Sequence, residues 1–469
     1  MRTKVFLTGA SGLWGREVLR QLRDRDDVEV SALVLPTRAD EVAMREFFDM
    51  RNLALISGDV TDAALVARAV ARADVVVHLA AMVSPLADQH PELTWRINVD
   101  GTRAIIDAVK ALPDPDRVRL IMAGSIAEIG SRNPPHHWGR VGDPVTASRF
   151  DIYGQSKIAA ERLAIDSGLV NWVWLRQTGL MHAGLVGVRD PIIFCQPLDG
   201  VMEWVSVGDA ARLIVGVVIE APPEVFGRVH DVGGGEGWRL TNWEVQTALP
   251  AAIGLADPRR WSDRNWYATR NFHGFWFTDS DDLNELVPFR RDTFADLLRE
   301  LPGEVTGAVR AATRIPPAVL KRVVMRPLAR QARGPLHALA HRDERYISAL
   351  FGSTEAWRQI GDWSTFEPVE PSRTPTYLDH GYDTDASSST WTAGVLQGAA
   401  EFRGGRLITT DARPGGVRDI LTWECADGHR FTGSPNLVLS AGHWCPICGA
   451  DPFDYDRQAE KNRFLAQVL

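Results

Sequence analysis

Two groups of residues in this chain have side chains and spacings that could carry chemistry. Tyr153 and Lys157 stand four residues apart in a stretch of helical character, so both side chains fall on one helix face. An ammonium beside a phenol favours the tyrosinate, which turns a group with an ordinary pKa of about 10 into a usable acid or base. Ser125, upstream of the pair, could hydrogen-bond the oxygen of a substrate that exchanges this proton.

The second group is a set of three cysteines and one histidine late in the chain. Cys425 precedes His429 by four residues, and Cys445 and Cys448 enclose Pro-Ile in a Cys-x-x-Cys knuckle. Thiolates and imidazole in this pattern predict a closed, tetrahedral zinc site. A redox Cys-x-x-Cys pair is the alternative, but it leaves Cys425 and His429 without a role. We therefore expect a structural zinc ion in a module whose own core is small.

The stretches that must position Tyr153, Lys157 and Ser125 alternate between β-rich and helical character. This order predicts βαβ units and hence an α/β fold, a doubly wound parallel Rossmann sheet with helices on both faces. The expected strands are Lys4–Thr8, Glu29–Leu35, Ala54–Ser57, Asp74–Leu79, Arg119–Ala123 and Trp172–Arg176. The expected helices are Arg16–Arg23, Leu65–Ala71, Thr94–Leu112 and Tyr153–Asp166.

A glycine-rich turn follows the first expected strand, with Gly9, Gly12 and Gly15 three residues apart. Glycine lets the backbone turn tightly and approach a pyrophosphate, whose charge then lies at a helix N-terminus. Taken alone, the triplet could be a plain turn of small residues. The strand before it and the helix after it favour dinucleotide binding instead.

The Gly-x-x-Gly-x-x-Gly spacing resembles that of the extended short-chain dehydrogenase/reductase family, which is NAD-dependent epimerase/dehydratase-like. Over residues 1–300 further segments match in the family's order: Gly58-Asp59-Val60, His78-Leu79-Ala80-Ala81, Asn98-Val99-Asp100-Gly101-Thr102, Tyr153-Gly154-Gln155-Ser156-Lys157 and 205–211. The resemblance implies catalytic roles for Ser125, Tyr153 and Lys157, and for Asn98 a water that connects Lys157 to solvent. It implies cofactor contacts from Gly9, Ser11, Gly12, Leu13, Gly15, Asp59, Val60, Leu79, Ala80, Ala81 and Lys157.

The residues after the second strand bear on the choice of nicotinamide. No acidic residue stands at the end of this strand. Arg38 follows the strand at a place from which its guanidinium could reach a 2′-phosphate. This favours NADP as the cofactor. NAD is the alternative, with Arg38 as a solvated loop residue.

The resemblance leaves three functions to compare. Ile126-Ala127 stands where the family's 4,6-dehydratases carry Asp-Glu, and Gln177-Thr178 stands where its epimerases usually carry an asparagine. We therefore expect an NAD(P)-dependent oxidoreductase that interconverts a carbonyl and an alcohol on a small-molecule substrate. An NAD-dependent epimerase of a nucleotide sugar and a non-enzymatic, cofactor-sensing binding protein are the alternatives. Helices beside the active site often pair in this family, so a homodimer is also open.

Beyond residue 300 the pattern changes. We expect a basic helical segment at 301–350, an irregular connector at 351–410 and a zinc-ribbon-like module at 411–469. Within 319–345 lie the basic residues Lys321, Arg322, Arg326, Arg330, Arg333, Arg342 and Arg345. They could dock an acidic protein partner or an anionic membrane surface, but a solvated helix face packed on the acidic catalytic domain is the favoured interpretation.

Composition excludes several classes of protein. The net charge of −8 gives no footprint for nucleic acid, so none is expected as a partner. The four cysteines do not make a disulfide framework, Cys195 is expected to be a buried thiol, and the first residues lead straight into a strand. These features predict a cytoplasmic protein. The longest apolar stretch, Leu213–Ile219, is too short to be a transmembrane segment.

Overall fold

A computed structural model describes residues 2–187 and 189–469. At its centre is a seven-stranded sheet in the order β3-β2-β1-β4-β5-β7-β11, in which all neighbouring strands are parallel. The strands are β1 (Thr3–Thr8), β2 (Val28–Val34), β3 (Leu53–Ser57), β4 (Val75–His78), β5 (Arg119–Ala123), β7 (Trp172–Gln177) and β11 (Arg228–Val232). Strands β2 and β3 are added on one side of β1, whereas β4 and the later strands are added on the other, so the strand order reverses between β1 and β4. Ligands of such sheets bind outside the carboxyl ends of the strands at this point. The expected fold class is confirmed.

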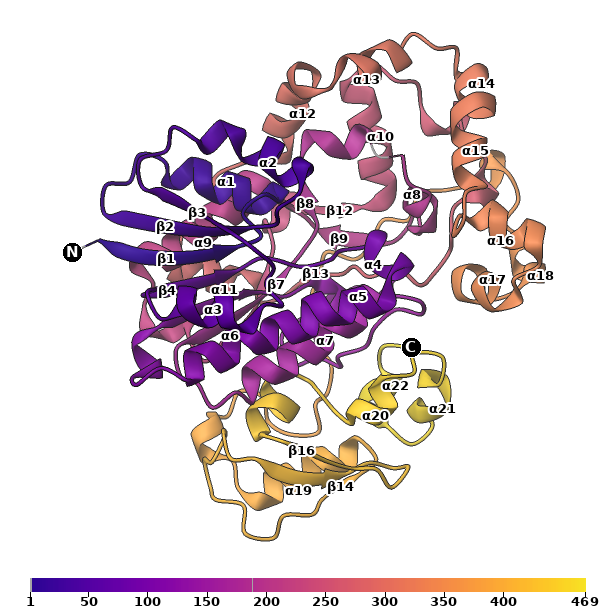
Figure 1. Ribbon diagram of the computed structural model, residues 1–469. Coiled ribbons are helices and arrows are strands. Elements are labelled where there is room, and N and C mark those ends of the chain that lie inside the picture. Colours follow the sequence, from indigo (N-terminus) through magenta and orange to yellow (C-terminus); the bar gives the residue numbers. More distant parts are fainter. Residues whose placement is uncertain (1, 188) are drawn as a thin grey trace.

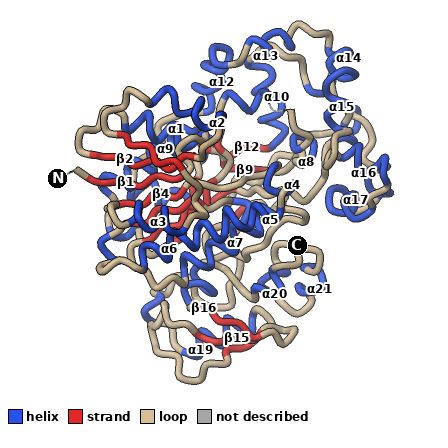
Figure 2. Tube along the Cα trace, in the orientation of Figure 1, coloured by secondary structure: helices blue, strands red, loops and turns tan. Residues whose placement is uncertain are grey.

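Helices cover both faces of the sheet (Figures 1 and 2). Strand β1 shows why, because Val5 and Leu7 pack into one buried apolar cluster and Phe6, pointing the other way, packs into a second. The first cluster includes residues of α1 (Leu13–Leu22), α2 (Arg38–Met44), α9 (Val207–Glu220) and α11 (Ser280–Leu286). The second includes residues of α3 (Ala63–Val70), α6 (Gly101–Lys110) and α7 (Ile152–Ile165).

All six expected strands lie within one residue of their predicted ends. The seventh, β11, was missed because its sequence, Arg-Val-His-Asp-Val, has no apolar run, although His230 and Asp231 are both buried. Beyond the carboxyl edge of the sheet lie shorter elements that surround the substrate side. They are α4 (Leu86–Gln89), α5 (Pro91–Trp95), β6 (Trp138–Gly139), β8 (Leu180–Met181), α8 (Ile192–Cys195), β9 (Val201–Glu203), β10 (Val205–Ser206), β12 (Arg239–Thr241), α10 (Asn242–Ala252) and β13 (Trp276–Phe277).

The second half of the chain forms two further regions. The helices that continue from the substrate side are α12 (Phe294–Glu304), α13 (Gly307–Ala312), α14 (Pro317–Leu320), α15 (Arg326–Ala329), α16 (Pro335–His341), α17 (Glu344–Phe351) and α18 (Thr354–Arg358), with a π-helical segment, Lys321–Met325, joining α14 to α15. The C-terminal module lies on the other side, below α7 in Figure 1. It contains α19 (Ala393–Phe402), β14 (Arg406–Leu407), β15 (Leu421–Glu424), β16 (Arg430–Gly433), α20 (Pro446–Gly449), α21 (Tyr455–Ala459) and α22 (Arg463–Ala466).

The structure differs from the sequence prediction at the connector. Residues 351–410 are not irregular throughout, because α19 and β14 lie within them and belong to the module. Strand β14 pairs with β15, and Leu396 and Ala400 of α19 share a buried apolar cluster with Trp423 and Phe431 of the module's hairpin. A two-residue strand carries too little sequence pattern to be recognised without its partner.

Candidate functional site

The predicted glycine turn lies at the carboxyl end of β1. Gly9 has a φ of +74°, and a Cβ there would come within 2.7 Å of the Ala80 amide nitrogen on the neighbouring chain after β4. A Cβ at Gly15 would collide with the carbonyl oxygen of Gly9. Gly12 is the N-cap of α1 and supplies no side chain to its free N–H groups, so this helix start is open to a phosphate. The residues present therefore fit the diphosphate of a dinucleotide.

Ser11 in this turn is bound to a carboxylate that the sequence analysis missed. Its hydroxyl donates to Asp40 Oδ1 at 2.5 Å. Asp40 stands in the first turn of α2, whose N-cap Thr37 accepts a bond from the Asp40 amide at 3.2 Å. The Thr-x-x-Asp capping pattern is the signal that could have found it. Arg38, predicted to contact a 2′-phosphate, is exposed beside it.

The other predicted cofactor residues lie around the same crevice. Ala80 donates its amide to Thr8 Oγ1 at 3.2 Å, which fixes the segment Leu79–Ala81 against the end of β1. Asp59 follows β3 and accepts two bonds of 2.9 Å from the amide and hydroxyl of Thr61. Val60 is buried. The fold thus brings together the segments that the sequence motifs named, from four different strands.

Tyr153 and Lys157 lie in the first two turns of α7, which Asp151 caps by accepting the Gly154 amide at 2.8 Å. Lys157 is buried and donates through Nζ to the carbonyl oxygen of Ala123 at 2.7 Å, at the end of β5. Ser125, two residues further on, is also buried. Its hydroxyl accepts the Ala127 amide at 3.1 Å. One strand end and one helix start therefore position the three predicted catalytic residues.

The protonation of these groups follows from their burial. Burial raises the pKa of Tyr153 above its ordinary value, and only hydrogen bonding to Ser125 opposes the rise. Burial alone therefore favours the phenol at neutral pH, and the tyrosinate expected from the neighbouring ammonium stays a prediction. Burial lowers the pKa of Lys157 to about 8, while the charge of Glu128 acts in the opposite direction.

Asn98 connects two segments beside the catalytic helix. It lies in a π-helical segment, Arg96–Asp100, between α5 and α6. Its side chain accepts the Met82 amide at 2.8 Å and donates to the Met82 carbonyl at 2.9 Å and to Ser156 Oγ at 2.9 Å. Asn98 therefore holds the chain after β4 against α7, and the water expected to connect Lys157 to solvent stays a prediction.

A buried polar network lies behind Ser125 and Lys157, and the sequence analysis did not find it. Glu128 accepts the Ser125 amide at 2.7 Å and faces Arg176 at 3.5 Å. Arg176 donates to both oxygens of Glu161, at 3.0 and 2.6 Å, and Glu161 receives a further bond of 2.9 Å from His443. Burial beside Glu161 raises the pKa of Glu128 well above its ordinary value.

This network connects the catalytic helix to the C-terminal module. Glu161 falls one and two turns after Lys157 and Tyr153 on the same face of α7. His443 belongs to the module, and its neighbour Ala441 packs in the sheet's second apolar cluster. No sequence signal marks a pair separated by 282 residues.

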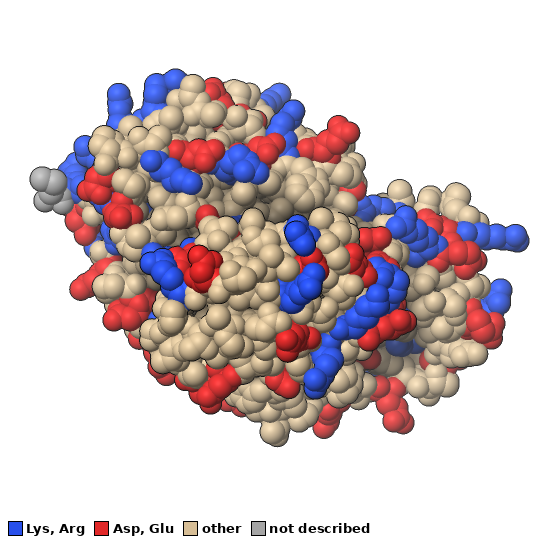
Figure 3. All heavy atoms as spheres, turned by 90° about the horizontal axis from the view of Figure 1, so that it is seen from below, with Lys and Arg blue, Asp and Glu red and all other residues tan. Residues whose placement is uncertain are grey.

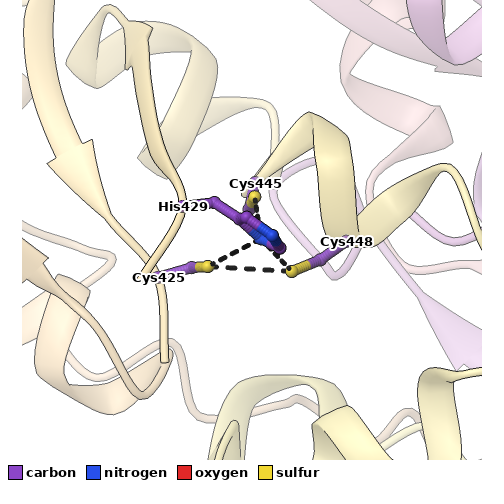
Figure 4. A group of neighbouring side chains, drawn as sticks. All are labelled: Cys425, His429, Cys445 and Cys448. Atoms are coloured by element: carbon purple, nitrogen blue, oxygen red, sulfur yellow. Dashed lines mark hydrogen bonds between the residues drawn. The ribbon is translucent and has the colours of Figure 1, made fainter. Parts of the chain in front are cut away.

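The predicted metal ligands converge on one point (Figure 4). Cys425 Sγ lies 3.7 Å from Cys448 Sγ, and His429 Nδ1 lies 3.4, 3.8 and 3.4 Å from the sulfurs of Cys425, Cys445 and Cys448. A tetrahedron with Zn–S bonds of about 2.3 Å has S–S edges of about 3.8 Å. The four donors lie within 4.8 Å of one another. Their identity and spacing therefore fit a tetrahedral zinc ion. Cys195, the fourth cysteine, is half-buried elsewhere.

A cavity of about 1370 Å³ lies between α8, α10, α13 and the α14–α15 helix, and its lining does not include Ser125, Tyr153 or Lys157. Most of its lining side chains are apolar, among them Leu249, Val309 and Leu328. Its lining includes Ser84, two residues after the Met82 segment that Asn98 holds, and Trp204, which packs on an apolar cluster that contains Ile126. The cavity is larger than a pocket for a drug-sized ligand, which spans about 300–1,000 Å³.

Figure 3 shows the molecule from below the view of Figure 1. On this side Lys and Arg lie among Asp and Glu, so neither sign of charge dominates the surface. Among the described residues, no helix combines the length and the apolar character needed to cross a bilayer.

Comparisons with known proteins agree with this geometry. Residues 5–176 match the model of the NAD dependent epimerase/dehydratase family. D-erythronate dehydrogenase of Cupriavidus necator is 30% identical over 167 residues, 34% of this chain and 49% of that protein. The 3 beta-hydroxysteroid dehydrogenase type 7 of Mus musculus is 28% identical over 204 residues, 40% of this chain and 53% of that protein. The chain thus spans about half the length of the curated relatives it matches.

Solved structures share the fold. The dTDP-glucose 4,6-dehydratase of Bacillus anthracis, in complex with NAD, has a TM-score of 0.52 at 17% identity and covers 66% of this chain and 100% of its own. The UDP-glucuronic acid 4-epimerase of Bacillus cereus, with UDP-glucuronic acid and NAD, has a TM-score of 0.51 at 16% identity and covers 64% and 98%.

Proposed function

We propose that the chain is an NAD-dependent oxidoreductase for a large apolar alcohol or carbonyl compound, on the premise that residues 5–176 match the model of the NAD dependent epimerase/dehydratase family. The observation that carries the proposal is the placement of Ser125, Tyr153 and Lys157 at the carboxyl edge of the sheet, beside the glycine turn. Both the acid and its supporting groups come from rigid elements, which suits proton transfer to a fixed substrate oxygen.

The chain's own residues would divide the work as follows. Tyr153, a phenol at neutral pH, donates its proton to the carbonyl oxygen in reduction and takes one back in oxidation. Ser125 donates a hydrogen bond to the same oxygen, and Lys157, held by Ala123, keeps a positive charge behind the tyrosine. A bound nicotinamide supplies the hydride chemistry.

Asp40 supports NAD over NADP. Its carboxylate is held at Ser11 in the glycine turn, where a negative charge would repel a 2′-phosphate. Arg38 could attract that phosphate, but it is exposed and solvated, so its contribution is the weaker of the two.

The cavity supports an apolar substrate over a nucleotide sugar. A nucleotide diphosphate needs cationic or amide partners, whereas this lining is formed mostly by aliphatic side chains. Of the two named relatives, the hydroxysteroid dehydrogenase has a substrate of this character.

The test measures whether hydroxysteroids or long-chain alcohols change the nicotinamide absorbance of the protein with added cofactor, and compares these substrates with nucleotide sugars. Tyr153→Phe should lower kcat by about a hundred- to ten-thousand-fold because the proton donor is removed. Tyr377→Phe is the matched control, since that phenol is 63% exposed and lies outside α7. Equal activity of both variants would contradict the role of Tyr153, and nucleotide-sugar product without net cofactor turnover would replace the oxidoreductase with an epimerase.

We further propose that the C-terminal module binds one structural zinc ion. The support is the match between the donor separations in the structure and the edges of a zinc–thiolate tetrahedron. Four protein donors leave no coordination position for substrate, so the ion would stabilise the module and take no part in the reaction.

A further inference from the structure

Residues 305–342 form a basic segment, with eight Lys and Arg residues and no Asp or Glu in a chain of net charge −8. They build α13 to α16, and α13, α14 and α15 follow one another along the outer edge of the molecule, at the upper right in Figure 1. Within the described part of the chain, only two of the eight pair with carboxylates, Lys321 with Asp263 and Arg333 with Asp88. The other six are exposed.

The α14–α15 helix presents a mixed face to solvent. Arg322, Arg326 and Arg330 recur every four residues and therefore share one side of the helix. Val319 and Val323, also four apart, lie beside them and are 46% and 64% exposed. Arginines interleaved with exposed aliphatic side chains are typical of helices that lie in a membrane interface, with the apolar groups in the acyl boundary and the cations at anionic headgroups.

The inner side of the same helix forms a wall of the apolar cavity. Leu320 and Leu328 are buried and line it. Val323 and Val324 also line it, yet 64% and 37% of their surfaces are exposed, so they stand where the cavity opens outward. The cavity opening and the basic face therefore lie on one helix. An apolar molecule that leaves the headgroup region of a membrane at this helix would meet the cavity first.

We propose that the α14–α15 helix docks on an anionic lipid surface and admits an apolar substrate from that surface into the cavity. The identity of the substrate rests on the proposed function, but the docking surface rests on its own residues. An acidic protein would also meet the arginines, but it would leave the exposed valines and the neighbouring cavity mouth unexplained.

The test is cosedimentation of the full chain with vesicles of phosphatidylglycerol and phosphatidylcholine, compared with vesicles of phosphatidylcholine alone. Binding should require the anionic lipid and weaken as salt is added. Arg322→Glu/Arg326→Glu should reduce the vesicle-bound fraction at least about tenfold, since each cation near an anionic surface contributes to binding. Arg68→Glu/Arg72→Glu, at the end of α3 and just after it, is the matched control, with two exposed arginines at the same spacing and the same change of charge.

Val319→Ser tests the apolar part, because it should weaken vesicle binding at high salt without changing the charge, whereas Val42→Ser, 49% exposed on α2, should not. Equal loss in the α14–α15 and α3 charge variants would overturn the proposal. Retention on polyglutamate with no binding to anionic vesicles would overturn it in favour of an acidic protein. Vesicle binding without turnover of any apolar alcohol would uphold the docking surface and reject the proposed function, so the two failures are distinguishable.

Discussion

At the glycine turn, the proposed cofactor site, the groups available to a ligand belong to the backbone, whereas at the proposed metal site of the C-terminal module they are side chains. The glycine turn exposes the N-terminus of α1. Its shape requires glycine, because a Cβ at Gly15 would collide with Gly9 and a Cβ at Gly9 would collide with Ala80. It lies on a sheet whose two apolar clusters cover both faces. The metal site instead gathers Cys425, His429 and the Cys445 knuckle within one small cluster around Trp423.

The difference concerns what makes each site exist. A parallel sheet buries enough apolar surface to hold the glycine turn whether or not a ligand is present. The module has a small core, in which Trp444 beside the knuckle packs on Trp423 and Phe431 of the hairpin. The proposed ion would add a second connection between hairpin and knuckle through the four donor atoms. The first site is therefore expected to fail by local crowding, and the second by unfolding.

The largest effect should follow loss of a metal ligand. Cys448→Ser should release the ion and with it most of the roughly 10–16 kcal/mol that structural zinc supplies to small modules. Metal content by mass spectrometry and thermal unfolding check this, with Cys195→Ser as the control cysteine outside the cluster. NADH binding that survives while the module melts would sharpen the contrast. Unchanged metal content in the ligand variant would refute the site.

Crowding of the glycine turn should have the next largest effect. Gly15→Ala places a methyl group against the Gly9 carbonyl, and overpacking of this kind costs about 1–3 kcal/mol, which corresponds to as much as about a hundredfold loss of NADH affinity. Gly307→Ala is the matched control, since a Cβ there meets nothing within 4 Å. Fluorescence titration with NADH measures both, and wild-type affinity in Gly15→Ala would show that the turn is less tight than described.

The buried network provides a test of whether the two sites are independent of each other. His443→Ala removes one bond to Glu161, which Arg176 still holds, and should lower the free energy of unfolding by about 1–3 kcal/mol. Because Arg176 also faces Glu128, which holds the Ser125 amide, kcat should fall severalfold as well. His443→Gln keeps a donor and should restore part of the activity. Lost stability with unchanged kcat would confine the module to a structural role.

The smallest expected effect concerns cofactor choice. Asp40→Asn removes the negative charge beside Ser11 and should shift the ratio of NADH to NADPH affinity toward NADPH by about tenfold, since a near-surface pair of charges is worth on the order of 1 kcal/mol. Glu41→Gln, its exposed neighbour in α2, is the control. An unchanged ratio of NADH to NADPH affinity would indicate that Arg38, and not Asp40, determines the choice of cofactor.

Local patterns determined what the sequence could predict. The glycine triplet, the Tyr153–Lys157 pair and the Cys/His set each lie within a short span, and strand periodicity placed six of the seven sheet strands to within a residue. Their chemistry depends on neighbours in the chain, which propensity and spacing describe directly.

Contacts between distant residues were decided only by the tertiary structure. Asp40 meets Ser11 because α2 folds back over the glycine turn, and His443 meets Glu161 because the module packs on α7. The cavity wall likewise comes from helices that are separate in the chain. In the sequence, each of these residues has only the local pattern of a helix cap, a buried polar group or an amphipathic turn. Burial of the apolar clusters in the folded chain is what brings each residue within bonding distance of its partner.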